Sequence, residues 1–205
     1  MESYTTILNK ARFEYEDRKS VFIASAAPVK TEEEALSFLS AVKKAYPDAK
    51  HHVYAYVLRE NSIMRFTDDR EPQGTAGMPV LDAIRKNGLT DAMVVVIRYF
   101  GGTLLGTGGL VRAYGTSALG ALRAAQIVTY DIYTTLEVVV SYSDYQKIIP
   151  ILDAAAFRCE DTKYSDSVKV IGRLQKSGTD ALITSLTEST SGRCEVNIIG
   201  EKFDF

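Results

Sequence analysis

Glycines and arginines are concentrated in one short segment, RYFGGTLLGTGGL, which begins at Arg98. Five of the chain's 14 glycines lie between residues 101 and 109, after a buried-strand pattern and before a helical one. Glycines let a ligand approach the backbone, and unpaired amides at a helix start point toward an anion. We expect Arg98 to reach this spot, and Arg112 to lie in the first helical turn, where a cation is unfavourable unless an anion offsets it. The candidate anion-binding residues are Arg98, Gly101, Gly102, Gly106, Gly108, Gly109, Arg112 and Tyr114.

A structural interpretation of the same segment stays open. The glycines can serve tight turns and close packing, while Arg98 and Arg112 pair with acidic loops of their own domain. Neither the GxGxxG spacing of dinucleotide-binding loops nor a GK[ST] sequence is present. We therefore expect no bound cofactor.

Three carboxylates, Asp68, Asp69 and Glu71, lie close together in the loop DDREPQGTAG at residues 68 to 77. They could hold Mg²⁺ beside a substrate phosphate, or they could pair with the two arginines. We favour pairing, because no further metal-ligand motif accompanies them and ion-pair networks are common. We assign no metal ligand. The three carboxylates and His51 are candidates for a supporting role or, in the alternative, for Mg²⁺.

The only histidines, His51 and His52, are adjacent in a predicted strand, so their side chains point to opposite faces. No motif pairs either histidine with a nucleophile, and we assign no catalytic residue.

The bulk properties exclude several classes of protein. A formal charge of -2 and a pI of about 5.8 create no global positive field, so any contact with nucleic acid needs a local patch. Two cysteines, Cys159 and Cys194, are too few for a disulfide framework and fit a reducing compartment. The polar amino terminus does not match a signal peptide, and no apolar run reaches the roughly 20 residues that span a bilayer. We expect a cytoplasmic protein without membrane contact.

The first 126 residues predict alternating strands and helices. A helix should begin after Thr31, which can cap it with Glu34, and another at Pro79. The uniformly apolar run 92–97 predicts a central strand buried on both faces. The predicted strands are 20–29, 51–60, 63–66 and 92–97. A last helix should extend to about Gln126, and the face of it that packs on the sheet should carry Leu110, Ala113, Ser117, Ala121 and Ala125.

A different pattern begins at Thr134. The order strand, helix, strand, strand, helix, strand is the ferredoxin-like βαββαβ signature. Ser143 with Gln146 predicts a capping box for the first helix, Pro150 should kink or shorten that helix, and Thr179 should cap the second. The predicted elements are a strand from Thr134, a helix over 144–156, strands 157–164 and 167–174, a helix over 180–189 and a strand over 194–203. We expect a stiff join between the two domains at roughly 127–134.

Together these segments resemble the IMPACT family, in its bacterial YigZ-like branch. The family's KSRFIA opening corresponds to residues 19–24, its histidine-containing strand to His51 with residues 54–56, and its DDGEPSGTAG loop to 68–77. Its RYFGG and LGxGGLxRAY motifs correspond to 98–102 and 105–114. The departures are Val21, His52, Arg70 and Gln73, where the family usually has arginine, asparagine, glycine and serine.

The resemblance implies an α+β protein with two domains. Residues 1–130 should resemble domain 2 of ribosomal protein S5, and residues 131–205 a ferredoxin-like domain of elongation factor G. It also implies a translation-associated regulatory protein that contacts RNA, the ribosome or a translation factor through the glycine-rich loop, by binding rather than by catalysis. Two alternatives are a Mg-dependent enzyme that transfers or hydrolyses phosphate, and a protein-interaction module. The oligomeric state is open.

Overall fold

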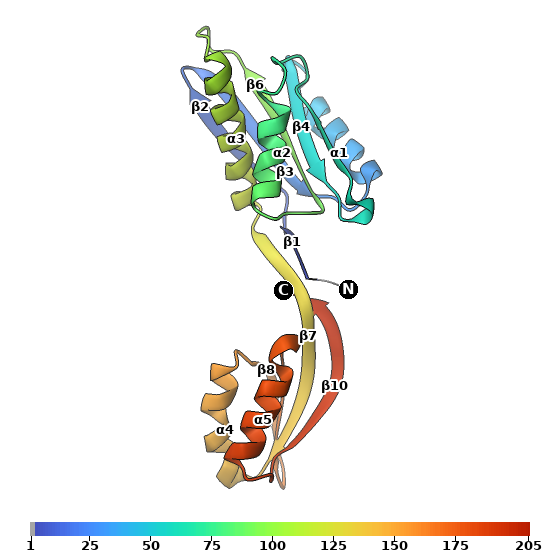
Figure 1. The fold of residues 1–205 in the computed structure, drawn as a ribbon, viewed down its shortest axis with the longest axis vertical. Coiled ribbons are helices and arrows are strands. Elements are labelled where there is room, and N and C mark those ends of the chain that lie inside the picture. The colour runs from blue at the N-terminus through green and yellow to red at the C-terminus, as the bar shows by residue number, and fades with distance from the viewer. Residues whose placement is uncertain (1–2) are drawn as a thin grey trace. The chain divides into compact units, whose positions relative to one another are not determined.

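The computed structural model describes residues 3–205, which divide into two compact units. One unit is Tyr4–Thr129 and the other consists mainly of Tyr130–Phe205 (Figure 1). Each unit combines helices with an antiparallel sheet, which confirms the predicted α+β class. Within the described residues, no helix is both long and apolar enough to cross a membrane.

The first unit is built on a five-stranded sheet with the order β2-β3-β6-β4-β5, and every pair in it is antiparallel. Its elements are β1 (Tyr4–Ile7), β2 (Ala11–Asp17), β3 (Ser20–Pro28), α1 (Glu32–Ala45), β4 (His51–Val57), the 3-10 turn Glu60–Ser62, β5 (Met64–Thr67), α2 (Gly77–Lys86), β6 (Ala92–Tyr99) and α3 (Gly106–Ala124).

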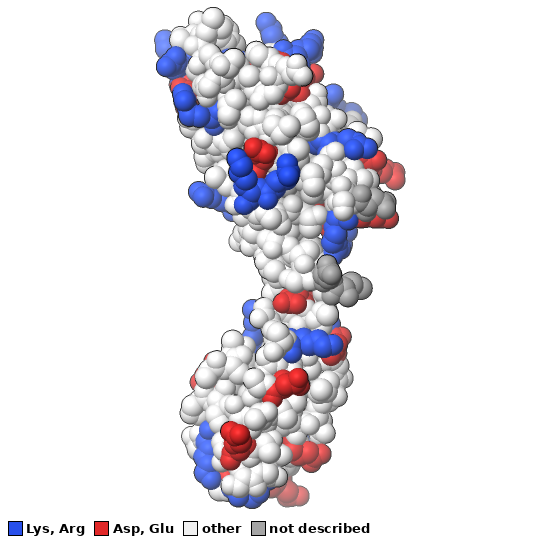
Figure 2. All heavy atoms as spheres, viewed as in Figure 1, with Lys and Arg blue, Asp and Glu red and all other residues white. Residues whose placement is uncertain are grey.

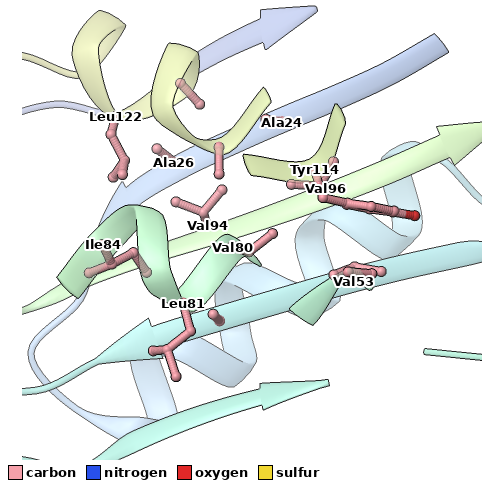
Figure 3. Packing of buried hydrophobic residues seen from close by; sticks show 14 of the residues in the cluster. Ala24, Ala26, Val53, Val80, Leu81, Ile84, Val94, Val96, Tyr114 and Leu122 are labelled. Carbon is pink, nitrogen blue, oxygen red and sulfur yellow. The ribbon is translucent and has the colours of Figure 1, made fainter. Parts of the chain in front are cut away.

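The strand β6 lies at the centre of this sheet and is buried from Ala92 to Arg98, as its apolar run predicted. The helix α1 covers one face, while α2 and α3 cover the other (Figure 1). On the α2 and α3 side, small residues let the helices approach the strands, and Figure 3 shows Ala24, Val94 and Val96 of the sheet beneath them. All five residues predicted for the inner face of α3 are buried.

The structure adds two strands to the predicted elements of this unit and corrects the start of one helix. Residues 4–17 are largely polar, yet they contain β1 and β2, because β2 needs only one apolar face for packing. Phe13 on that strand packs so closely on α3 that a Cβ on Gly120 would lie 2.2 Å from its ring. The helix α2 begins at Gly77 rather than at Pro79, because a distant carboxylate, Asp68, accepts bonds from its first amides.

The second unit contains a sheet in which β7 lies between β10 and β9, with β8 outermost, and β1 also pairs with β7. The pairings of β7 with β10, β7 with β9 and β8 with β9 are all antiparallel. Its elements are β7 (Ile127–Val140), whose first residues belong to the first unit, α4 (Tyr142–Ala154), β8 (Arg158–Tyr164), β9 (Val168–Gln175), the 3-10 turn Lys176–Gly178, α5 (Thr179–Ser189) and β10 (Glu195–Asp204).

The helix starts in this unit differ from the predicted ones. Ser141, rather than Ser143, caps α4 by accepting a bond from the amide of Asp144. The helix then continues through Pro150 to Ala154, so the proline does not shorten it. Thr179 is the first residue of α5 instead of its cap, because a 3-10 turn precedes it and Gly178 takes the capping position.

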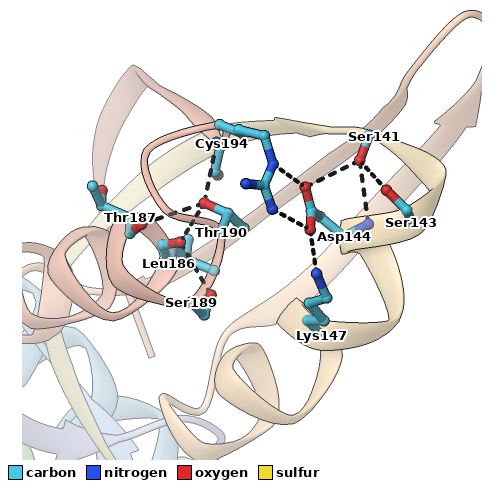
Figure 4. A network of polar contacts seen from close by, with 10 residues as sticks. Ser141, Ser143, Asp144, Lys147, Leu186, Thr187, Ser189, Thr190 and Cys194 are labelled. Carbon is cyan, nitrogen blue, oxygen red and sulfur yellow. Dashed lines mark hydrogen bonds and ion pairs between the residues drawn. The ribbon is translucent and has the colours of Figure 1, made fainter.

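A buried carboxylate, Asp144, joins the start of α4 to the segment before β10 (Figure 4). It accepts two bonds of 3.0 Å from the Arg193 guanidinium and one of 2.7 Å from Lys147. These bonds hold the pKa of Asp144 well below its usual range, and the bonds from Arg193 contribute most to the shift. The network is therefore a charged brace within the second unit.

Candidate functional site

A buried ion pair lies where β6 ends. The Arg98 side chain is 9% exposed and donates from Nη1 to both oxygens of Glu71, at 2.8 and 3.1 Å. The Tyr114 hydroxyl donates to the same carboxylate at 2.8 Å. Burial and then the Glu71 charge raise the pKa of Tyr114 far above its usual range, so the hydroxyl stays protonated and remains a donor. Arg98 and Tyr114 therefore face a carboxylate of their own chain.

The other carboxylates of the 68–77 loop also form internal contacts. Asp68 accepts bonds from the amides of Gly74, Ala76 and Gly77, at 2.7 to 3.1 Å, and so holds the loop against the start of α2. Asp69 accepts a bond of 2.6 Å from the His52 amide through its carboxylate. No group of three or more His, Cys, Asp or Glu residues within 3–205 is placed to hold a metal ion.

The structure brings His51 beside Arg98, its cross-strand partner in the register of β4 and β6. His51 Nδ1 lies 2.8 Å from the Asp69 carbonyl oxygen, which can only accept, so Nδ1 carries the proton. Nε2 forms no hydrogen bond with any described residue. One ring nitrogen of His51 is therefore held by the loop, and the other is unused.

The glycines of the segment fall into two groups. A Cβ on Gly101 would lie 2.0 Å from the backbone of Lys19, and one on Gly109 would lie 2.9 Å from Leu105, so both are required by packing. Gly102 and Gly106 are exposed and have positive φ angles of 84° and 72°. Gly108 is also exposed, but its φ is not left-handed and a Cβ there would meet no atom within 4 Å. Nothing within the described chain requires a glycine at 108.

The start of α3 is open to solvent. Among the described residues no side chain caps it, and its first turn contains no acidic residue. Arg112 is exposed and has no ion pair within residues 3–205. However, the helix begins at Gly106, so the prediction that Arg112 lies in the first turn was wrong. No contact brings Arg112 together with Arg98.

A cavity of about 450 Å³ opens beside the ion pair. Phe100 and Leu104 form its apolar part, and the phenyl ring of Phe100 lies 5.6 Å from the Arg98 guanidinium carbon. The Nε of Arg98 is buried and has no partner among the described residues. The lining residues are Asp48, Lys50, His51, Arg98, Tyr99, Phe100 and Leu104.

Exposed cations lie beside this cavity. Arg18 donates to the carbonyl of Leu104 at 3.5 Å, and Arg70 donates to the carbonyl of Lys50 at 3.3 Å. Both acceptor residues line the cavity. Figure 2 shows Lys and Arg side chains at this end of the first unit, where the β2–β3 turn and the loop after β6 lie in Figure 1. We call Arg18, Lys19, Lys50 and Arg70 the basic rim.

Three of the rim residues have strained backbones. Arg18, Lys19 and Arg70 have φ angles of 47°, 65° and 71°, in the left-handed region that favours glycine. Arg18 and Lys19 form the two-residue turn between the paired residues Asp17 and Ser20. Sequence reasoning did not select Arg18, Lys19 or Lys50 as site residues, and the dipeptide Arg-Lys at 18 and 19 lacks the glycine or asparagine that usually signals a two-residue hairpin turn.

The comparisons with known proteins identify the family. The family model described as Impact N-terminal domain matches residues 18–122, which include the whole cavity and the basic rim. The chain belongs to the IMPACT family. A second model, described as a domain of unknown function (DUF1949), matches residues 138–193.

Its relatives include bacterial proteins of similar length, and also Protein IMPACT of Homo sapiens, to which the chain is 35% identical over 94 residues, covering 44% of this chain and 29% of that protein. The chain is 36% identical to IMPACT family member YvyE of Bacillus subtilis over 197 residues, covering 96% of this chain and 91% of that protein. It is 44% identical to IMPACT family member YigZ of Escherichia coli over 111 residues, covering 53% and 54%. A solved structure described as "Crystal structure of an hypothetical protein" matches with a TM-score of 0.60 and 30% identity, covering 98% of each chain.

Proposed function

We propose that this protein is a cytoplasmic, translation-associated regulator that binds RNA through the glycine-rich loop and the first turn of α3. Membership in the IMPACT family supports the link to translation, because the resemblance implies a role in translational control for the eukaryotic relatives. The observation that carries the proposal is the open start of α3, where glycines face solvent and no described side chain caps the amides. An RNA phosphate can satisfy those amides.

Gly108 is the residue of this surface that most directly indicates a ligand close to the backbone. Glycine in a helix is less favourable than alanine by about 1 kcal/mol, and no contact within the described chain offsets that cost. A ligand that approaches the backbone closely would account for it. Direct contact with phosphate is therefore assigned to Gly102, Gly106, Gly108 and Arg112.

The remaining predicted residues are assigned to support. Arg98, Glu71 and Tyr114 pack beneath the loop, and Tyr114 is fully buried. Gly101 and Gly109 allow the loop and α3 to pack closely. In this proposal they fix the position of the loop, while the exposed residues bind the strand.

We further propose that the domains correspond to residues 1–130 and 131–205. The first would have the fold of domain 2 of ribosomal protein S5 and the second a ferredoxin-like fold. The element order from β7 to β10 and the sheet order β10-β7-β9-β8 support the second assignment.

A Mg-dependent phosphate-transferring or hydrolytic activity at the same loop is the second candidate. The three carboxylates that it would need are hydrogen-bonded to the chain's own amides or to Arg98, which favours the binding proposal. A ligand of the folded state must raise the melting temperature. A shift produced by nucleoside triphosphate only with Mg²⁺ would favour the enzyme.

RNA binding by the full chain tests the proposal. Arg112→Ala should weaken the binding of ribosomal RNA at low salt, because one phosphate contact is lost. Arg123→Ala is the matched control, since Arg123 is exposed in the last turn of the same helix. If wild type retains no RNA and does not sediment with ribosomes, the proposal is wrong. If Arg112→Ala lowers stability without altering RNA binding, Arg112 has no role in contact and the interaction-module alternative gains support.

A further inference from the structure

The cavity beside Arg98 has the size and the polarity of a small-molecule site. Its volume of about 450 Å³ lies within the roughly 300–1,000 Å³ that such sites occupy. Phe100 on its wall is 58% exposed, and the Arg98 guanidinium carbon lies 5.6 Å from the centre of its ring. Its ring leaves an aromatic face available for stacking.

Polar groups with unused hydrogen-bonding capacity belong to the same wall. His51 Nε2 has no partner among the described residues, while Nδ1 is held by the Asp69 carbonyl oxygen. Arg98 is more than nine-tenths buried, and its Nε also has no partner there. An unsatisfied buried donor costs free energy, so an incoming acceptor would stabilise this arrangement. The wall thus offers an acceptor at His51 and a ring at Phe100, and it includes Arg98, whose buried Nε has no partner among the described residues.

A nucleotide also carries a phosphate group, which cations at the mouth of the cavity can contact. Lys50 lines the cavity, and Arg18 and Arg70 are each bonded to the carbonyl of a lining residue. Left-handed backbone at a residue other than glycine costs roughly 1–2 kcal/mol. Arg18 and Arg70, which contact lining residues, are nevertheless basic and in that conformation, as is Lys19 in the same turn as Arg18.

We propose that this cavity holds one unstacked nucleotide of a bound single-stranded RNA. The base stacks on Phe100 and its polar edge meets His51 and Arg98, while the basic rim contacts the phosphates on either side. The inference rests on the proposed RNA binding and deepens it, because it assigns the base to a site distinct from the α3 amides.

Single-stranded RNA fits these observations better than a phosphorylated peptide. A phosphate group alone would use the cations and leave the exposed ring of Phe100 without a role. Single-stranded RNA offers unstacked bases that stack on aromatic side chains, whereas bases in a duplex are already stacked on each other. The cavity therefore predicts a preference for single strands.

Two substitutions at one position test the inference in the full chain. Phe100→Leu keeps an apolar side chain and removes the ring, and Phe100→Tyr keeps the ring. In fluorescence anisotropy with a short single-stranded RNA at low salt, Phe100→Leu should weaken binding by roughly 5- to 100-fold, the usual effect of losing a stacked base. Phe100→Tyr should bind like wild type. The same RNA annealed to its complement should bind both variants equally.

The outcomes separate this inference from the function on which it rests. Tight binding of the single strand by Phe100→Leu would overturn the nucleotide cavity and leave RNA binding by α3 intact. Failure of wild type to bind any RNA would overturn both. A melting-temperature rise with free adenosine monophosphate, without binding of the strand, would assign the cavity to a small molecule instead. Equal melting temperatures of the three proteins in the absence of RNA establish that folding is unchanged.

Discussion

At the scale of single residues, Glu71 joins the acidic loop to β6 and to α3. It is the partner of two side chains far along the chain, Arg98 at 27 positions and Tyr114 at 43 positions. It balances a buried positive charge at the base of the glycine-rich loop. Loss of one member of a buried pair leaves the other charge without compensation.

Glu71→Gln should therefore destabilise the protein by about 3 kcal/mol, because the Arg98 charge stays buried without its counter-charge. Urea unfolding followed by circular dichroism measures the change. The matched control is Asp161→Asn, whose ion pair with Lys163 is long at 3.8 Å and exposed at both ends, and it should cost under about 1 kcal/mol. Equal losses in the two variants would contradict a special role for Glu71.

Arg70 shows how a single position links the sequence to the backbone. The family usually has glycine there, and the structure gives the reason, since φ is 71°. The arginine keeps this left-handed conformation and places its guanidinium at the Lys50 carbonyl. The substitution thus adds a cation to the rim of the cavity.

At the scale of elements, α3 contains two glycines, Gly108 and Gly115, that differ in their position along the helix. Gly108 lies in the exposed first turn, whereas Gly115 lies mid-helix, where a Cβ would be 4.0 Å from Pro79. Neither position needs glycine for its own backbone conformation. Replacing either glycine with alanine should therefore raise the stability of the protein, whereas only the replacement of Gly108 should change RNA binding.

Gly108→Ala should raise stability by up to about 1 kcal/mol, because alanine is the better helix former. It should also weaken RNA binding, by roughly three- to tenfold, since a methyl group keeps phosphate away from the helix amides. Gly115→Ala should give a similar stability gain with unchanged RNA affinity. Thermal unfolding and anisotropy measured on the same samples provide both values. Unchanged RNA affinity in Gly108→Ala would count against contact at the α3 start.

The brace at the start of α4 makes the second unit sensitive to acid. The pKa of Asp144 is lowered in the folded state, first by the bonds from Arg193 and then by those from Lys147. An unfolded aspartate titrates near about 3.9. The stabilisation is therefore fully present above that pH and is lost as pH falls through the lower pKa of the folded state.

Asp144→Asn should accordingly lower the melting temperature at pH 7, and the gap from wild type should narrow as the pH falls below about 4. Thermal unfolding of both proteins at several pH values from 7 to below about 4 measures the difference in melting temperature. Asp153→Asn, an exposed position in the last turn of the same helix, should behave like wild type at every pH. A gap that stayed constant with pH would show that the carboxylate charge is not what stabilises the brace.

At the scale of the whole molecule, a net charge of -2 coexists with a local group of cations at one end of the first unit. Such a protein has no general attraction for polyanions. Any RNA affinity then comes from the few phosphates that reach the basic rim and the α3 start.

The salt dependence of RNA binding should reflect the small number of phosphate contacts. With three or four phosphate contacts, the logarithm of the binding constant should fall with the logarithm of salt concentration with a slope of roughly -2 to -3. Arg18→Ala should reduce the magnitude of the slope by about 0.7. Anisotropy titrations at several salt concentrations give the slope. A slope near zero would exclude phosphate contact as the source of affinity.

The sequence alone determined the properties that depend on neighbouring residues. The apolar run at 92–97 predicted the buried central strand, Thr31 predicted the cap of α1, and the small residues of α3 predicted its packed face. The motifs between residues 19 and 114 were sufficient by themselves to indicate the IMPACT family. Periodicity, capping and motif spacing are local, so they can be read from the order of residues.

Only the tertiary structure decided which distant groups meet. It placed Asp68 on the amides that start α2 and Glu71 between Arg98 and Tyr114. It also brought the segments around residues 18, 50, 70 and 100 to one cavity, which no spacing in the sequence indicates. Antiparallel pairing of β4 and β6 puts His51 opposite Arg98, and this depends on the register of two strands between which β5 and α2 lie in the sequence. Side-chain partners across such distances are set by packing, so the sequence could supply the charged groups but not their pairing.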